Sequence, residues 1–159
     1  MKTYNILFLC THNSARSILG EALASTHPSG KFAGYSAGST PGTSVNPIAA
    51  NIAVELGMDR TLLKSKSWDV FGEPNAPKMD FIITVCDNAA GEVCPFWPGQ
   101  PATAHWGFPD PSQVQGSDLE KKAAFIEVMN GLKKRLDILA AMPLDKLDSM
   151  SLKEVHTKA

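Results

Sequence analysis

One short segment near the amino terminus combines a nucleophile with an anion-binding group. Cys10 ends an apolar run, and Arg16 and Ser17 follow it six and seven residues later. A loop that leads from a buried parallel strand into a helix presents backbone N–H groups, which bind tetrahedral oxyanions. Arg16 would add a planar, two-pronged donor to the same anion. The predicted oxyanion-binding loop consists of Thr11, His12, Asn13, Ser14, Ala15 and Arg16.

The same loop should change the chemistry of its cysteine. Donors that bind an anion also favour a thiolate, so we expect a depressed pKa for Cys10, with Ser17 as a further hydrogen-bond donor to the sulfur. A thiolate of this kind is both a nucleophile and a good leaving group. The alternative is a buried cysteine that merely closes a strand. The chain has no GxxxxGK[ST] motif, so the loop is not a nucleotide-binding P-loop.

Two further thiols follow a second apolar run. Cys86 comes directly after residues 80–85, a run rich in β-branched side chains, and Cys94 lies eight residues later. Carboxyl ends of parallel strands meet at one edge of a sheet, so Cys86 should face the same crevice as Cys10. A helix between Cys86 and Cys94 would hold their Cα atoms about 12 Å apart. A disulfide needs less than roughly 7 Å, so this pair would require the segment to unwind. Two small buried thiols are the alternative.

An acidic side chain follows the next apolar run. Asp110 lies between two prolines, after the residues His105 and Trp106. An aspartate in such a loop could act as a general acid or base over a bound anion. Pro-Asp-Pro is also good turn chemistry whatever the function, so both interpretations stay open.

The elements that must position these residues follow from the pattern. Short apolar runs alternate with helical periodicity, which is typical of an α/β fold with a parallel sheet. We expect strands at residues 4–9, 31–36, 80–85 and 102–106. We expect helices from about Ala15 to near Pro28, from Asn46 to Gly57 with Pro47 at the first position, and from Ser117 to Leu139. A single domain over residues 1–142 precedes a tail at 143–159, either a short docked helix or a frayed end.

Composition narrows the class of protein. The chain has 159 residues, 15 basic and 16 acidic side chains, and a formal net charge of −1. Nucleic-acid and membrane-surface proteins need a basic excess, so neither partner is expected. Three cysteines do not make a secreted disulfide scaffold, which favours a cytoplasmic location and thiols used in chemistry. The four histidines form no HxxxH pair, and no CxxC motif supports a zinc site.

These residues resemble a known family. Residues 10–17 match the C-x5-R-[ST] signature of low-molecular-weight protein tyrosine phosphatases, and Ser36-Ala37-Gly38 is similar to the family's SAG turn. The resemblance extends over about residues 4–140. It implies a three-layer, flavodoxin-like fold, with a sheet of four parallel strands flanked by helices.

A second resemblance is more specific. CDNAAGEVCP (86–95) together with AHWGFPDP (104–111) is similar to the arsenate reductases built on this phosphatase fold. The resemblance implies that Cys10 is the nucleophile, Cys86 and Cys94 the first and second resolving thiols, Arg16 the oxyanion ligand and Asp110 the proton donor. Ser112 follows Pro111 where the phosphatases carry a tyrosine, which speaks against phosphotyrosine as substrate.

The resemblance also implies a reaction and its partners. Arsenate would be reduced to arsenite through an intramolecular disulfide relay, with phosphate or sulfate as substrate analogues. An external thiol reductant, thioredoxin or glutathione with glutaredoxin, would regenerate a monomeric enzyme that holds no cofactor. Two alternatives remain: phosphomonoester hydrolysis by Cys10, Arg16 and Asp110, and a non-catalytic oxyanion or arsenite sensor.

Some relatives hold an alkali cation beside this loop, on an Asn, a Glu, a Ser and an Asp. Asn13, Glu21 and Ser36 agree in place, and Ser67 stands where the aspartate is expected. We therefore predict no metal site here, although these three residues are the candidate ligands of an alkali cation.

Overall fold

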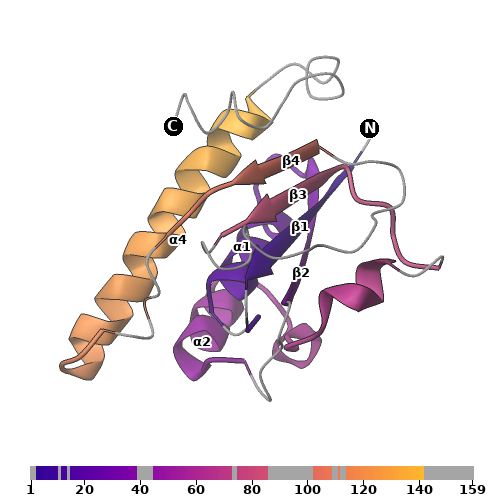
Figure 1. Cartoon of the computed structure of the whole chain (residues 1–159). Helices are drawn as coiled ribbons and strands as arrows, with labels where there is room; N and C mark the ends of the chain where they lie inside the picture. The colour runs from indigo at the N-terminus through magenta and orange to yellow at the C-terminus, as the bar shows by residue number, and fades with distance from the viewer. Residues whose placement is uncertain are drawn as a thin grey trace.

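A parallel sheet forms the centre of the protein. The computed structural model describes residues 3–10, 12–13, 15–38, 45–72, 75–85, 102–108, 111 and 114–141. Within them the strands are β1 (Tyr4–Cys10), β2 (Phe32–Gly38), β3 (Phe81–Thr84) and β4 (Ala102–His105). They pair in the order β2-β1-β3-β4, and every pairing is parallel (Figure 1). The predicted α/β fold with a parallel sheet is confirmed, with strand ends shifted by one or two residues.

Helices cover both faces of this sheet. The α-helices are α1 (Arg16–Ser25), α2 (Pro47–Glu55) and α4 (Asp118–Ala140), and the 3₁₀ helices are η1 (Arg60–Leu62) and η2 (Trp68–Gly72). The alternation of side chains along a strand divides the core in two. Ile6, Phe8 and Ile83 point toward the α-helices, whereas Leu7, Leu9 and Ile82 pack with Trp68, Phe71 and Met79.

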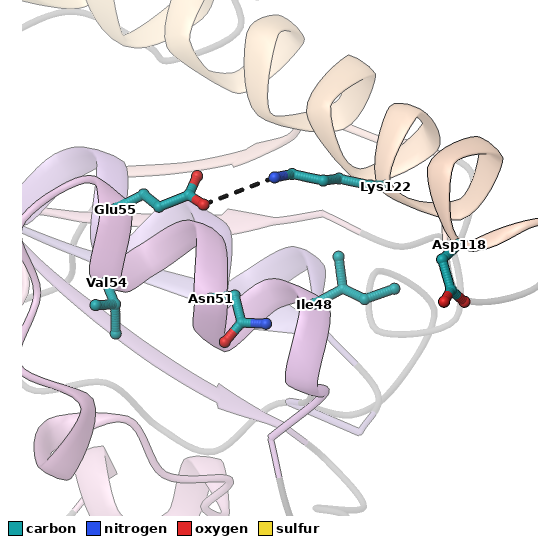
Figure 2. A pocket seen from close by; sticks show the side chains of 6 residues that line it. All are labelled: Ile48, Asn51, Val54, Glu55, Asp118 and Lys122. Carbon is teal, nitrogen blue, oxygen red and sulfur yellow. Dashed lines mark ion pairs between the residues drawn. The ribbon is translucent and has the colours of Figure 1, made fainter.

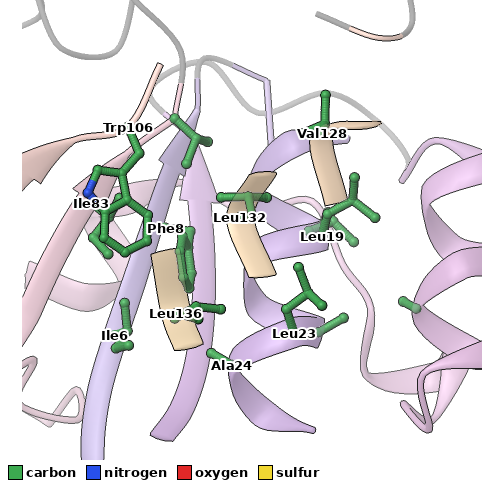
Figure 3. Close-up of a cluster of buried hydrophobic side chains, with 14 of the residues drawn as sticks. Ile6, Phe8, Leu19, Leu23, Ala24, Ile83, Trp106, Val128, Leu132 and Leu136 are labelled. Atoms are coloured by element: carbon green, nitrogen blue, oxygen red, sulfur yellow. The ribbon is translucent and has the colours of Figure 1, made fainter. Parts of the chain in front are cut away.

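The larger core joins the sheet to α1 and α4. Figure 3 shows Phe8 and Trp106 on the sheet side and Leu19, Leu132 and Leu136 on the helices. Phe8, Trp106 and the three leucines are fully buried. Fully burying a side chain of this size contributes about 1.5–3 kcal/mol, so this layer fixes α1 firmly against β1.

Local signals in the sequence explain where α2 and α4 begin. The Asn46 side chain accepts hydrogen bonds from the backbone N–H groups of Ile48 and Ala49. Ser117 and Glu120 form a reciprocal capping box at the start of α4. Both motifs satisfy backbone donors that a helix start leaves without partners. The predicted starts of these two helices are confirmed.

The register of the sheet gathers the strand ends at one edge. Cys10 pairs with Gly38, Leu9 with Thr84, and Thr84 with His105. Beyond the strands, the N–H of Phe108 donates to the carbonyl of Val85 at 3.2 Å. The segments that leave β1, β2, β3 and β4 therefore start side by side, which is the edge at which parallel sheets bind ligands.

Candidate active site

Cys10 lies at the carboxyl end of β1, where it is 4% exposed. The chain then turns into α1, whose N-cap position is Ala15. No side chain among the described residues caps this helix start. A helix start presents backbone N–H groups and the positive end of the helix dipole, both of which attract an anion.

Asn13 sets the shape of the turn. Its φ is 51°, in the left-handed region that asparagine tolerates better than most residues, and its side chain is fully buried. The Asn13 Nδ2 group donates to Ser17 Oγ at 2.8 Å, and Oδ1 accepts from the backbone N–H of Lys66 at 2.8 Å. One side chain thus joins the turn both to α1 and to a distant loop.

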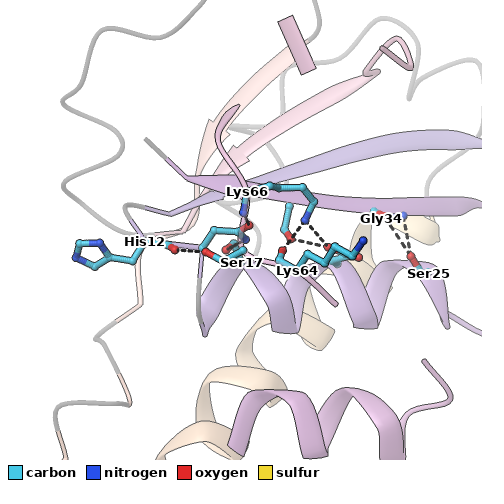
Figure 4. Close-up of polar contacts among 10 residues, drawn as sticks. His12, Ser17, Ser25, Gly34, Lys64 and Lys66 are labelled. Atoms are coloured by element: carbon cyan, nitrogen blue, oxygen red, sulfur yellow. Dashed lines mark hydrogen bonds and ion pairs between the residues drawn. The ribbon is translucent and has the colours of Figure 1, made fainter. Parts of the chain in front are cut away.

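The distant loop, residues 64–67, supports the turn that follows Cys10 at several points. Ser65 Oγ donates to the carbonyl of His12 at 2.8 Å (Figure 4). The N–H of Gly38 donates to the carbonyl of Lys66 at 2.9 Å, and Gly38 forms a parallel bridge with Ser67. Because Gly38 is the last residue of β2, these contacts anchor the turn to the sheet.

Ser17 is the second residue of α1 and contacts the turn through Asn13. Its hydroxyl is fully buried, and its oxygen accepts the hydrogen bond from Asn13. A hydroxyl that accepts in this way keeps its own proton for donation. This arrangement is compatible with the predicted donation to the Cys10 sulfur.

Arg16 reaches across the sheet edge. Its Nη1 donates to the carbonyl of Phe108 at 2.8 Å, although the two residues are 92 positions apart. The Phe108 ring lies 4.8 Å from the Arg135 guanidinium, which also lies 5.9 Å from the Trp106 ring. These contacts hold the guanidinium of Arg16 beside the segment that leads from β4 toward Asp110.

A buried carboxyl group lies behind the turn. Glu21 is 7% exposed, accepts a hydrogen bond from Ser36 Oγ at 2.5 Å, and lies 3.8 Å from Lys66 Nζ. Burial raises the pKa of Glu21, which the Ser36 hydrogen bond and the Lys66 charge oppose. Burial lowers the pKa of Lys66, which the Glu21 charge opposes. For both groups desolvation is the larger effect, and their mutual attraction offsets it only in part.

The three candidate ligands do not fit a bound alkali cation. Asn13 Oδ1 accepts from a backbone N–H and the Ser36 hydroxyl donates to Glu21, and each oxygen keeps a lone pair, so the neighbouring charge decides the question. The Lys66 ammonium lies beside the Glu21 carboxylate, where it would repel an added cation. Within the described ranges, no three His, Cys, Asp or Glu side chains gather as metal ligands.

The structure thus brings together part of the predicted site. The predicted residues at or behind the turn are Cys10, His12, Asn13, Ala15, Arg16, Ser17, Glu21 and Ser36. Thr11, Ser14, Cys86, Cys94 and Asp110 lie outside the described residues. Sequence reasoning missed Lys66, Ser65 and the carbonyl of Phe108. Two of these contribute backbone groups and all are remote in the chain, so no residue pattern could have indicated them.

A separate groove lies between α2 and α4. It has a volume of about 610 Å³, and Figure 2 shows its lining, with an ion pair of 3.6 Å between Lys122 and Glu55. The other lining residues are Ile48, Asn51, Val54 and Asp118. None of the predicted site residues that the structure describes lines this groove.

Comparison with known proteins identifies the family. A family model described as low molecular weight phosphotyrosine protein phosphatase matches residues 5–151. The chain belongs to this family. It is 36% identical over 135 residues to an arsenate reductase of Halalkalibacterium halodurans, an alignment that covers 85% of this chain and 94% of that protein.

Two solved structures are similar over nearly their whole length. One, an arsenate reductase in the phosphate binding state, is 29% identical with a TM-score of 0.64, covering 89% of this chain and 98% of that one. Another, an arsenate reductase in an oxidized state, is 28% identical with a TM-score of 0.65 and the same coverage. Within its family the chain is thus an enzyme of the arsenate reductase group, and the predicted resemblance is confirmed. Among the described helices, none combines the length and apolar character needed to cross a membrane.

Proposed function

We propose that the protein reduces arsenate to arsenite at the Cys10 turn. The observation that carries this proposal is the position of Cys10: it ends β1 and leads into the start of α1, while Arg16 is held at the same edge by the Phe108 carbonyl. Arsenate is a tetrahedral oxyanion, so the N–H groups at the start of α1 and the Arg16 guanidinium suit it.

The first half of the reaction forms a bond between sulfur and arsenic. The Cys10 thiolate attacks arsenic, and Asp110 protonates the departing oxygen, which leaves as water. The Ser17 hydroxyl and the backbone donors stabilise the thiolate before attack. Arg16 neutralises charge on the remaining arsenate oxygens, so it acts on both the ground state and the transition state.

The second half transfers two electrons. The Cys86 thiolate attacks the Cys10 sulfur, the electron pair of the S–As bond moves to arsenic, and arsenite leaves with a Cys10–Cys86 disulfide behind it. Cys94 then attacks Cys86 and releases the Cys10 thiolate. An external dithiol, thioredoxin or glutaredoxin with glutathione, supplies two electrons and two protons to the Cys86–Cys94 disulfide.

The experiment follows arsenite formation and thiol state together. Wild-type protein is mixed with arsenate and either the thioredoxin or the glutaredoxin system, and arsenite is measured directly beside NADPH oxidation. Cys94→Ser should complete one turnover and stop with Cys10 linked to Cys86, which peptide mass spectrometry detects. Cys10→Ser is the matched control and should form neither arsenite nor the disulfide. Repeated turnover of Cys94→Ser with thioredoxin alone would contradict the relay.

Phosphomonoester hydrolysis is the second candidate, because the family model is named for phosphatases and the same turn suits phosphate. Hydrolysis needs Cys10, Arg16 and Asp110 but neither of the other thiols. Cys86→Ser should therefore keep any turnover of p-nitrophenyl phosphate while losing arsenate reduction. If arsenate is not reduced and the phosphate ester is hydrolysed equally well in both forms, the protein is a phosphatase.

We further infer the setting of this reaction. The complete fold would be three-layered and flavodoxin-like, with one domain over residues 1–142 and a tail at 143–159. The tail lies outside the described residues, which end at 141. The enzyme would act in the cytoplasm, because thiols are kept reduced in that compartment. It would act as a monomer.

A further inference from the structure

The loop that braces the Cys10 turn carries a partly buried cation of its own. We propose that the Lys66 ammonium takes the place of a bound alkali cation beside Glu21, and that it positions the turn without any metal ion. Lys66 is in this view a positioning residue, since it acts through its contacts with Asn13 and Glu21. The inference rests on the proposed function for its kinetic test but not for its thermal one.

The first argument is the charge arrangement. Lys66 Nζ lies 3.8 Å from Glu21 Oε1 and donates to the carbonyl of Lys64 at 2.8 Å (Figure 4). The Glu21 and Lys66 side chains are 10% and 26% exposed. The ammonium therefore faces one carboxylate oxygen and one carbonyl oxygen, both of them ligands that a hard monovalent cation would also use. An ammonium is a compact point charge, which suits this role better than a guanidinium.

The second argument is the route from this charge to the turn. The backbone N–H of Lys66 donates to Asn13 Oδ1, and its carbonyl accepts from Gly38. The side chain of the same residue is held against Glu21 of α1. The ammonium thus fixes the backbone whose N–H orients Asn13, and Asn13 in turn orients Ser17.

The third argument is that a lysine and an alkali cation exclude each other here. Ser36 Oγ and Lys66 Nζ both approach the same oxygen, Glu21 Oε1. A second positive charge would meet the ammonium at close range with no added carboxylate to compensate it, since Ser67 contributes only a hydroxyl. Among the described residues, Lys66 is the cation that is paired with Glu21.

The test replaces the ammonium with a neutral chain of similar length. Lys66→Met is compared with wild type in potassium, sodium and tetramethylammonium chloride at one ionic strength, by thermal unfolding of the reduced protein and by kcat/KM for arsenate. Lys64→Met is the matched control, because it changes net charge equally while its carbonyl still accepts from Lys66. Lys66→Arg keeps a charge in place and should retain most of the activity.

We expect wild type and Lys64→Met to behave alike in all three salts. Lys66→Met should lose roughly tenfold in kcat/KM in tetramethylammonium chloride, as a small displacement of catalytic groups does, and should regain most of it in potassium or sodium. Its melting temperature should rise with the small cations and not with tetramethylammonium.

Three outcomes would overturn the proposal. One is a wild-type melting temperature or kcat/KM that rises saturably with potassium. Another is a Lys66→Met variant indistinguishable from wild type in every salt. The third is a loss in Lys66→Met that no small cation restores, which would leave the lysine a purely structural role. If Lys66→Met does not fold, the wild-type salt series and Lys66→Arg decide. If wild type does not reduce arsenate, the thermal series still tests the cation while the proposed function fails.

Discussion

The side chain of Asn13 offers the sharpest test of how the turn is built. Asn13→Ala removes the hydrogen bond that Asn13 donates to Ser17 and the one it accepts from the Lys66 N–H, and leaves that partly buried N–H without its acceptor. An unsatisfied buried donor costs about 1–3 kcal/mol, and the bond to Ser17 adds about 1 kcal/mol. Alanine at a φ of 51° costs roughly 1 kcal/mol more. We therefore expect a loss of about 3–5 kcal/mol in the free energy of unfolding.

A second substitution at the same position separates the two causes. Asn13→Gly loses both hydrogen bonds, but glycine adopts a positive φ without strain. Asn13→Gly should therefore be about 1 kcal/mol more stable than Asn13→Ala. Urea unfolding of reduced protein measures both differences, with the slope of the transition checked for constancy. Arsenate kcat/KM should fall in both variants, because Ser17 and the turn lose their support.

Two results would refute this reasoning. If Asn13→Ala were as stable as wild type, the two hydrogen bonds would carry no net free energy. If Asn13→Gly were less stable than Asn13→Ala, the left-handed backbone at this position would not be a constraint.

Three further predictions concern the packing of β2 on α1, the predicted anion ligand Arg16 and the buried carboxyl group of Glu21. A Cβ at Gly34 would lie 2.4 Å from the Glu21 carbonyl oxygen, so Gly34→Ala should lose about 1–3 kcal/mol of unfolding free energy, measured in urea. Gly30→Ala is the control and should lose less, because its Cβ would meet open space, at a φ of 68°. Arg16→Lys keeps the charge but loses the planar fork that donates to the Phe108 carbonyl; arsenate kcat/KM should fall by at least about 100-fold, and a change below tenfold would argue against Arg16 as oxyanion ligand. Because burial raises the pKa of Glu21 above 4.5, the folded protein binds this proton more tightly than the unfolded chain, so unfolding free energy should fall as pH rises upward from 4.5 through the folded pKa. Glu21→Gln should lack that decline in urea unfolding between about pH 4 and pH 7, and identical pH profiles for the two proteins would contradict the raised pKa.

Local patterns in the sequence were sufficient to predict where several helices and strands begin or end. Asn46 followed by Pro47 predicted the start of α2, and Ser117 that of α4, because each cap acts on backbone groups within three residues of itself. The apolar run before Cys10 predicted a buried strand and placed the cysteine at its carboxyl end. The predicted strand ended at Leu9, whereas β1 continues to Cys10, since its last pairing depends on Gly38 of β2.

Contacts between distant residues were not predictable in this way. Lys66 is 53 positions from Asn13, and Phe108 is 92 positions from Arg16, yet both contacts involve backbone groups that every residue type except proline carries. Nothing in residue type or periodicity marks such a partner.

Sequence alone therefore determined which residues could do chemistry: a cysteine, an arginine and a serine at fixed spacing on a turn between a strand and a helix. Tertiary structure decided what holds them there. The pairing of β1 with β2 brings Gly38 to the end of Cys10's strand, and Gly38 and Asn13 together hold the backbone of Lys66 against the turn. Spacing along a chain encodes contacts within a few residues, whereas these long-range hydrogen bonds exist only after the sheet has aligned its strands and the core has fixed α1 against them.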